Sequence, residues 1–370
     1  SRFYGFKFSV ICDQTRNLIR HAILVHCMGD RSRSPLGRGR TVHLPPDLKL
    51  ARSVAVDAVL AACQLASSVQ YSLTSTDIAS KADCSPVTVA DLGAQAVVAR
   101  KLFSVFPNIP LLGEEDASEL RASSSLAAKV VAVVQEVIPD SSKETVIADL
   151  DRARHDGGSG LFWVIDPIDG TKGFLRKEQY AVCLALVHDG CVLLAILGCP
   201  NLPVDPEMPR GELGCLFIAV RGKGATQYNI LSKSEKSISV SATADASSII
   251  CVESVEAGHS KHSEHAVISE ALKIEEPPVR MDSQCKFGVV ARGEASLYLR
   301  FSGKDQNIWD IAAGAMIVEE AGGKASDAHG APLNFACGRT IGACKLFASN
   351  GLVHEDVLQA IRETKSETDT

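Results

Sequence analysis

The segment from Phe162 to Thr171 constrains the fold most, because it joins an apolar run to two acidic residues, a proline and a glycine. Residues 162–165 are aromatic and β-branched, which predicts a short strand. Proline donates no hydrogen bond to a sheet and disfavours helix in the residue before it, so we expect Pro167 to end the strand. Asp166 and Asp169 are therefore predicted to lie at a strand's carboxyl end.

The spacing of these two acids suits divalent cations. Mg²⁺ takes oxygen ligands and keeps water and substrate phosphate in its shell, so Asp166, Asp169 and the Ile168 carbonyl suit a pair of such ions. Gly170 allows the backbone to approach a ligand closely. A helix that begins at Gly170 or Thr171 would point unpaired N–H groups at an anion. Taken alone, the motif is equally typical of an Asp-Gly turn after a strand.

Three other acidic segments are informative when they are considered together with this motif. Glu114 and Glu115 follow an apolar lead, and clustered like charges cost stability unless a cation binds or water solvates them. Asp310 begins a predicted small-residue helix, and Asp91 leads into a predicted amphipathic one. Each position by itself is typical of a solvated loop or a helix cap. Their joint occurrence in one order is therefore the informative observation.

These four segments resemble the signatures of a known phosphatase superfamily. Residues 166–171 read Asp-Pro-Ile-Asp-Gly-Thr, and residues 309–314 read Trp-Asp-Ile-Ala-Ala-Gly. Both are similar to signatures of the lithium-sensitive, magnesium-dependent superfamily that includes inositol monophosphatase. The resemblance extends from about Leu48 to near the C-terminus. It implies a layered α/β sandwich of αβαβα order, the sugar-phosphatase or inositol monophosphatase-like fold.

Further segments are similar to the 3'(2'),5'-bisphosphate nucleotidase branch. These are DPIDGTKGFLR at 166–176, ESVEAGHS at 253–260 and MDSQCK at 281–286. A substrate with two phosphates needs cationic partners, and Lys and Arg supply charge-assisted hydrogen bonds. By this resemblance, the expected substrate-binding residues are Gly170, Thr171, His259, Ser283, Lys286, Arg300 and Asp310.

The resemblance also implies roles for the acidic residues. The expected ligands of two or three Mg²⁺ ions are Glu114, Asp166, the Ile168 carbonyl, Asp169 and Asp310. Asp166 would bridge two ions, and Glu115 would reach a third through water. Asp91 and Thr171 are the expected catalytic residues, with Asp91 activating the attacking water through the Thr171 hydroxyl. Inhibition by Li⁺ is implied, because a monovalent ion supplies less charge at a Mg²⁺ position.

Composition divides the chain into a leader and a catalytic unit. The first 45 residues have eight Lys/Arg against two acids, while the rest has 30 against 42. Residues 1–47 therefore have the composition of an organellar transit peptide, with a disordered extension as the alternative. Residues 48–370 are predicted to form two packed lobes, a metal-binding lobe over about 48–200 and a nucleotide-binding lobe over about 201–370.

Two segments test whether the chain spans a membrane. Residues 48–69 alternate apolar and polar positions at helical spacing, which predicts an amphipathic first helix. Residues 181–198 are strongly apolar, but His188-Asp189-Gly190 divides them, which predicts a buried hairpin too short to span a bilayer. We expect a soluble intracellular protein, cytoplasmic unless the leader directs it to a plastid or mitochondrion.

The twelve cysteines include no Cys-x-x-Cys pair. Scattered spacing in a chain of 370 residues argues against a structural zinc site and a secreted disulfide framework. Most are expected to be buried small hydrophobic residues in a reducing compartment. No zinc-finger spacing or aromatic-basic interleaving indicates nucleic-acid binding.

The expected activity is Mg²⁺-dependent hydrolysis of the 3'-phosphate of 3'-phosphoadenosine 5'-phosphate, giving AMP and phosphate. The resemblance implies 3'-phosphoadenosine 5'-phosphosulfate as a second substrate and a place in sulfur assimilation, in a monomer or weak dimer. One alternative is a phosphatase of inositol phosphates or fructose 1,6-bisphosphate, which shares the metal ligands. Another is a catalytically silent nucleotide-binding regulator, against which the full set of hydrolytic residues argues.

Overall fold

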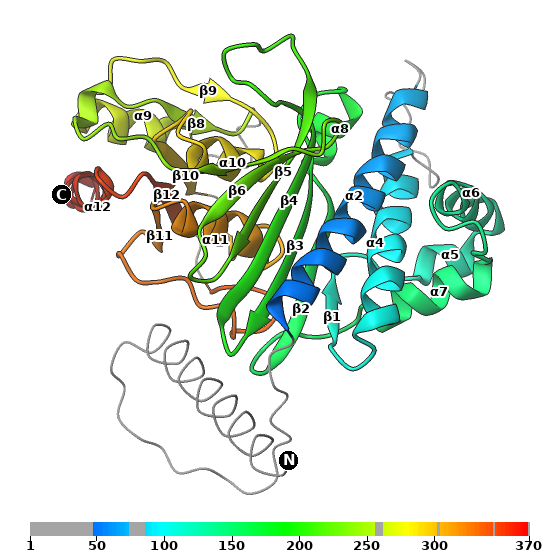
Figure 1. The fold of residues 1–370 in the computed structure, drawn as a ribbon. Helices are drawn as coiled ribbons and strands as arrows, with labels where there is room; N and C mark the ends of the chain where they lie inside the picture. Colours follow the sequence, from blue (N-terminus) through cyan, green and yellow to red (C-terminus); the bar gives the residue numbers. More distant parts are fainter. Residues whose placement is uncertain (1–46, 74–85, 256–261, 302–303, 343–344, 369–370) are drawn as a thin grey trace, which may run out of the picture. The chain divides into compact units, whose positions relative to one another are not determined.

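The computed structural model describes residues 47–73, 86–255, 262–301, 304–342 and 345–368. The chain divides into two units, Ser1–Leu44 and Pro45–Thr370, and all described elements belong to the second (Figure 1). The expected leader therefore lies outside the described residues, apart from Asp47, and so does the predicted substrate contact His259.

Helices and sheets alternate in five layers (Figure 1). A seven-stranded sheet has the helices α2 and α4 on one face and α10 and α11 on the other. A five-stranded sheet packs on the far side of α10 and α11, and α9 and α12 cover its outer face. This arrangement confirms the predicted αβαβα sandwich.

The first sheet has the order β1-β2-β3-β4-β5-β6-β7, so each strand lies beside its neighbour in sequence. β1 and β2 are parallel, and the other pairs are antiparallel. The strands are β1 Leu111–Gly113, β2 Leu161–Asp169, β3 Ala181–His188, β4 Cys191–Pro203, β5 Leu213–Val220, β6 Ala225–Asn229 and β7 Glu235–Ile238. The helices around it are α2 Leu48–Ser72, α4 Pro86–Val105, α5 Ser118–Ala122, α6 Ser124–Gln135, α7 Lys143–Arg152 and α8 Thr171–Leu175.

The second sheet has the order β11-β12-β10-β8-β9. Its strands are β8 Cys251–Glu253, β9 Val279–Arg280, β10 Leu297–Phe301, β11 Lys324–Asp327 and β12 Lys345–Ser349. The remaining helices are the short 3₁₀ segment η1 Ala246–Ser248 and the α-helices α9 His262–Ala271, α10 Cys285–Ala291, α11 Ala312–Glu320 and α12 His354–Thr368.

The first helix, α2, confirms the amphipathic prediction. Asp47 caps it by accepting a hydrogen bond from the Lys49 N–H at 2.9 Å. Among the described residues, α2 alone is long and apolar enough to cross a bilayer. Its alanine-rich face is fully buried against α4 and the first sheet (Figure 1), as expected for a core helix of a soluble protein.

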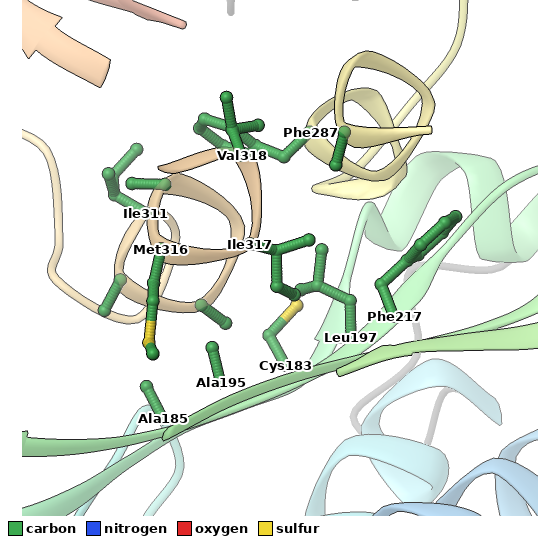
Figure 2. Packing of buried hydrophobic residues seen from close by; sticks show 14 of the residues in the cluster. Cys183, Ala185, Ala195, Leu197, Phe217, Phe287, Ile311, Met316, Ile317 and Val318 are labelled. Carbon is green, nitrogen blue, oxygen red and sulfur yellow. The ribbon is translucent and has the colours of Figure 1, made fainter. Parts of the chain in front are cut away.

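The helices α10 and α11 form the central layer and pack closely against each other and against the first sheet (Figure 2). Met316 and Ile317 of α11 pack on Ala195 and Leu197 of β4. A Cβ atom at Gly314 would lie 2.2 Å from the Phe287 ring of α10. Glycine in the Trp-Asp-x-Ala-Ala-Gly signature is therefore required by packing between the two helices.

Three boundary predictions were wrong. The helix α4 begins at Pro86, so Asp91 lies inside it rather than at its start. β2 continues past Pro167 to Asp169, with a shift of register between Asp166 and Asp169. Proline is tolerated there because β1 ends opposite Ile165 and the ladder to β3 is irregular. The helix α11 begins at Ala312, so Asp310 lies in the turn before it rather than on its first residue.

The apolar segment 181–198 forms the predicted hairpin, with β3 and β4 joined at Asp189-Gly190. The first sheet then continues through β5, β6 and β7 to Ile238. It therefore crosses the lobe boundary expected near residue 200, because β5 pairs with β4 along its whole length. The division into a metal-binding and a nucleotide-binding lobe stays a prediction.

Of the eight described cysteines, all are free and six are buried.

A buried histidine at the start of α12 is held by two serines. His354 Nδ1 and Nε2 lie 2.9 Å from Ser349 Oγ and Ser326 Oγ. Ser326 donates its proton to the Asp327 carbonyl, so it accepts from Nε2–H, and Ser349 then donates to Nδ1. This network satisfies the neutral ring, and burial, with the charge of Lys324, lowers the pKa of His354 to about 4.

We predict that this histidine makes folding sensitive to acid. Because the folded pKa lies below the usual value of 6.5, its contribution is complete above pH 6.5 and is lost as the pH falls toward 4. At about 1.4 kcal/mol per pKa unit, the loss is roughly 3 kcal/mol. Urea unfolding at pH 7 and 4.5 measures it. His354→Gln, which hydrogen-bonds without titrating, should reduce the difference; an unchanged difference would contradict the prediction.

Candidate active site

Three aspartates meet where β2 ends. One carboxylate oxygen each from Asp166, Asp169 and Asp310 lies within 4.8 Å of the others. Asp166 and Asp169 belong to β2 of the first sheet. Asp310 belongs to the turn before α11, a helix that packs on one face of that sheet. The predicted metal ligands from two distant parts of the chain are therefore brought together.

The donor set fits a divalent cation. Asp166 is 2% exposed, and its Oδ1 has no hydrogen-bond partner among the described residues. Burial and the charges of Glu114 and Asp169 raise the pKa of Asp166 well above its usual value. Burial and Asp310 raise the pKa of Asp169 to about 6, against the opposing effect of Arg300. A buried oxygen without a partner amid like charges is what an all-oxygen Mg²⁺ or Ca²⁺ site requires.

Glu114 and Asp91 extend this cluster of negative charge. Burial and the nearby Asp310 raise the pKa of Glu114 to about 8, while a hydrogen bond with Asp166 opposes the shift. Asp91 projects from α4, and burial with the charges of Glu115 and Glu114 raises its pKa well above the usual range. The pKa of Glu115 is raised too, mainly by burial. Without cations, each of these carboxyls is therefore protonated more readily than an exposed one.

The turn after β2 shapes the phosphate side of the site. Gly170 caps α8 with φ 89°, and a Cβ atom there would lie 2.8 Å from Ser283 Cβ. Thr171 begins α8, as predicted. Ile168 lines the cavity and also belongs to the same buried core cluster as Phe174.

The predicted cationic residues lie on the second half of the chain. Arg300 forms an ion pair with Asp310, Nη2 to Oδ2 at 2.8 Å. Lys286 is 2% exposed and donates to the Met281 carbonyl at 3.1 Å. Ser283 has φ 66°, a left-handed conformation that costs energy in serine.

A cavity of about 440 Å³ collects these residues. Asp91 is not among its described lining residues. Four lining residues were not predicted: Lys172, Ser254, Asp282 and Asn307. Ser254 follows the end of β8, and Lys172 lies in the Asp-Gly-Thr-Lys run, so their positions in the sequence could have predicted a place in the site. No sequence feature pointed to Asn307. The predicted residues that line the cavity are Glu114, Asp166, Ile168, Asp169, Gly170, Thr171, Ser283, Lys286, Arg300 and Asp310.

The profile of the inositol monophosphatase family matches residues 47–366. The chain belongs to this family. Members of the inositol monophosphatase family are generally Mg²⁺-dependent phosphatases, which agrees with the buried acidic cluster. The roles assigned to individual site residues stay predictions, as does the expected oligomeric state.

Curated relatives in this family share the name 3'(2'),5'-bisphosphate nucleotidase. The one from Emericella nidulans is 38% identical, over 77% of this chain and 90% of its own. The one from Schizosaccharomyces pombe is 42% identical, over 70% and 79% respectively. The one from Oryza sativa is 37% identical, over 85% and 94%.

Solved structures confirm the fold alone. CysQ from Bacteroides thetaiotaomicron, described as a bacterial member of the inositol monophosphatase family, has a TM-score of 0.59 at 22% identity. The match covers 82% of this chain and 98% of CysQ. Inositol monophosphatase from Anabaena (Nostoc) sp. PCC 7120 has a TM-score of 0.58 at 21% identity, over 86% and 97%.

We predict that Asp166→Asn stabilises the metal-free protein. The substitution removes a buried negative charge from the cluster, so the melting temperature in chelator should rise by roughly 2–5 °C. Added Mg²⁺ should stabilise the wild type and leave this variant nearly unchanged. Thermal unfolding with and without Mg²⁺ measures both effects.

Asp149→Asn is the matched control, because Asp149 is also buried but pairs with Arg100 at 2.7 Å. It should lower the melting temperature and preserve the Mg²⁺ response. The prediction fails if Asp166→Asn destabilises the protein in chelator as Asp149→Asn does.

Proposed function

We propose that this enzyme hydrolyses the 3'-phosphate of 3'-phosphoadenosine 5'-phosphate, giving AMP and inorganic phosphate. The shared name of the relatives at 37–42% identity supports this substrate class. We also propose 3'-phosphoadenosine 5'-phosphosulfate as a second substrate, dependence on two or three Mg²⁺ ions, and inhibition by Li⁺.

One observation favours a substrate with two anionic groups. The cavity places cationic Lys286 and Arg300 in the same space as the acidic cluster. A phosphate held at the acidic cluster through cations leaves these side chains for a second anionic group. Arg300 also forms an ion pair with Asp310, so its guanidinium contacts the acidic cluster as well as the space left for the second anionic group.

The chain's own groups can be assigned to the steps of hydrolysis. When bound, Mg²⁺ ions supply charge stabilisation and make water a better nucleophile at neutral pH. The N–H groups at the start of α8, at Gly170 and Thr171, are proposed to hold phosphoryl oxygens. Asp91, through the Thr171 hydroxyl, would take the proton of the attacking water as its oxygen bonds to phosphorus and the bond from phosphorus to the 3'-oxygen breaks. The leaving 3'-oxygen would take a proton from solvent water and become the 3'-hydroxyl of AMP. Asp91 can accept a proton only as a carboxylate. Burial and the charges of Glu115 and Glu114 raise its pKa, and cations that neutralise those two charges would remove their part of the shift.

We predict that the full chain releases phosphate from 3'-phosphoadenosine 5'-phosphate faster than from inositol 1-phosphate or fructose 1,6-bisphosphate. Phosphate release with Mg²⁺, with and without millimolar Li⁺, tests the substrate and the ions together. Faster release from a sugar or inositol phosphate would contradict the nucleotide assignment and keep the metal chemistry. Absence of turnover with intact nucleotide binding would favour the silent regulator.

We predict that Asp91→Asn lowers kcat by a factor of roughly 10²–10⁴, because an amide cannot accept the water proton. Asp91 is not among the described cavity-lining residues, so nucleotide and metal binding should change little. Steady-state kinetics beside calorimetric nucleotide binding separates the two effects. Near-normal kcat in this variant would remove Asp91 from the catalytic role.

A further inference from the structure

Two fully buried glutamines flank the acidic cluster, and neither belongs to the predicted site. Gln284 is 1% exposed and lies just before α10, while Gln95 is fully buried on α4. Each side-chain amide donates to one backbone carbonyl and accepts from one backbone N–H. Burying an amide costs free energy unless both partners are present, so this arrangement fixes the backbone segments that it joins.

Gln284 connects the two segments that supply the aspartates. Its side-chain Nε2 donates to the Trp309 carbonyl at 2.7 Å, and its Oε1 accepts from the Gly314 N–H at 3.1 Å. These two bonds bracket Asp310. The Gln284 backbone N–H donates to Asp169 Oδ2. One residue therefore holds the carboxylate of β2 and the turn that presents Asp310.

The backbone conformation makes this double contact possible. Ser283 adopts φ 66°, and its Oγ accepts from the Cys285 N–H at 3.2 Å. This turn directs the next N–H toward Asp169 while α10 continues in the other direction. The close approach of Phe287 to Gly314 brings α11 within reach of the Gln284 side chain.

Gln95 makes the corresponding connection on the other side. Its Nε2 donates to the Glu115 carbonyl at 2.7 Å, and its Oε1 accepts from the Glu115 N–H at 3.0 Å. Gln95 lies four residues after Asp91, on the same face of α4. A Cβ atom at Gly113 would lie 2.6 Å from the Gln95 amide, so glycine leaves the space for it. The backbone beside Glu114 is thereby tied to the helix of Asp91.

We propose that Gln284 and Gln95 are positioning residues that set the spacing of the metal-binding carboxylates. Loss of either amide would weaken divalent-cation binding beyond any effect on the fold. The proposal rests on the metal site of the proposed function. Groups that orient metal ligands typically change metal affinity by about 10–100-fold when removed.

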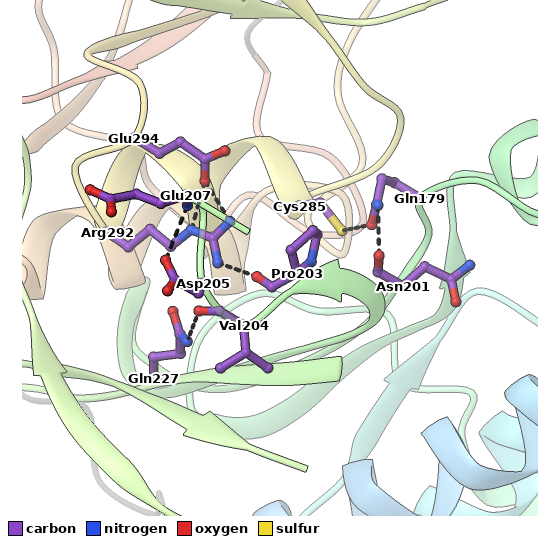
Figure 3. Close-up of polar contacts among 10 residues, drawn as sticks. All are labelled: Gln179, Asn201, Pro203, Val204, Asp205, Glu207, Gln227, Cys285, Arg292 and Glu294. Atoms are coloured by element: carbon purple, nitrogen blue, oxygen red, sulfur yellow. Dashed lines mark hydrogen bonds and ion pairs between the residues drawn. The ribbon is translucent and has the colours of Figure 1, made fainter. Parts of the chain in front are cut away.

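The test is Mn²⁺ binding, which is measured from the electron paramagnetic resonance signal of free Mn²⁺. This measurement needs no turnover. Gln284→Met and Gln95→Met keep side-chain length and remove both hydrogen bonds. Gln227→Met is the control for a buried amide outside the metal site (Figure 3). Gln227 is 2% exposed and donates to the Val204 carbonyl at 2.8 Å, while its Oε1 has no hydrogen-bond partner among the described residues. Gln227 does not line the cavity.

We expect Mn²⁺ affinity to fall at least about tenfold in Gln284→Met and Gln95→Met and to stay near the wild-type value in Gln227→Met. The melting temperature should fall less in Gln227→Met, which loses one side-chain hydrogen bond, than in the other two variants, which lose two each, so affinities are compared at a temperature where all three are folded. If a methionine variant does not fold, Gln284→Asn or Gln95→Asn replaces it, because the shorter amide stays polar and cannot reach both partners.

Equal Mn²⁺ affinity in all folded variants and the wild type would overturn this inference and leave the proposed function intact. A wild-type protein that binds no Mn²⁺ would instead overturn the metal site of the proposed function.

Discussion

Concentrated negative charge at the end of β2 is the constraint on which the rest of this structure depends. Asp166 is buried with an oxygen that no described group satisfies, and Asp169 and Asp310 lie beside it. Like charges at such distances are unfavourable in a poorly hydrated site, so a fold that holds them there needs external cations or bound protons. The raised pKa values of Glu114 and Asp91 extend the same effect across α4 and β1.

The layered fold explains how these charges are held together. The parallel pair β1–β2 presents its carboxyl ends at one edge, and the buried helix α11 brings Asp310 from the far face. Polar contacts around the α8 turn add further support. Gln179 donates to the Asn201 carbonyl at 2.9 Å (Figure 3). Asn201 in turn donates to the Glu178 carbonyl at 2.6 Å. The site is therefore embedded in several elements rather than built on one flexible loop.

The sequence predicted the fold class and the acidic residues because their motifs are local and chemically specific. The Asp166–Thr171 run and Asp310 are readable from residue types and from resemblance. The continuation of β2 past Pro167 was not readable, since it depends on where β1 ends. The roles of Gln95 and Gln284 were hidden for a related reason: each depends on backbone atoms distant in sequence. Contacts across the fold have no local signature in a single sequence.

The order of strands in the first sheet has a consequence for how the protein matures. β2 to β7 pair with their neighbours in sequence, so that meander needs only short loops to close and can form early. Asp310 joins Asp166 only when α11 has docked, which closes a long loop of chain and is therefore expected later in folding. A cation that binds all three aspartates would therefore stabilise the completed fold and not an intermediate in which α11 has not docked. Cellular supply of the ion would then govern how long newly made molecules survive, as well as how fast they work.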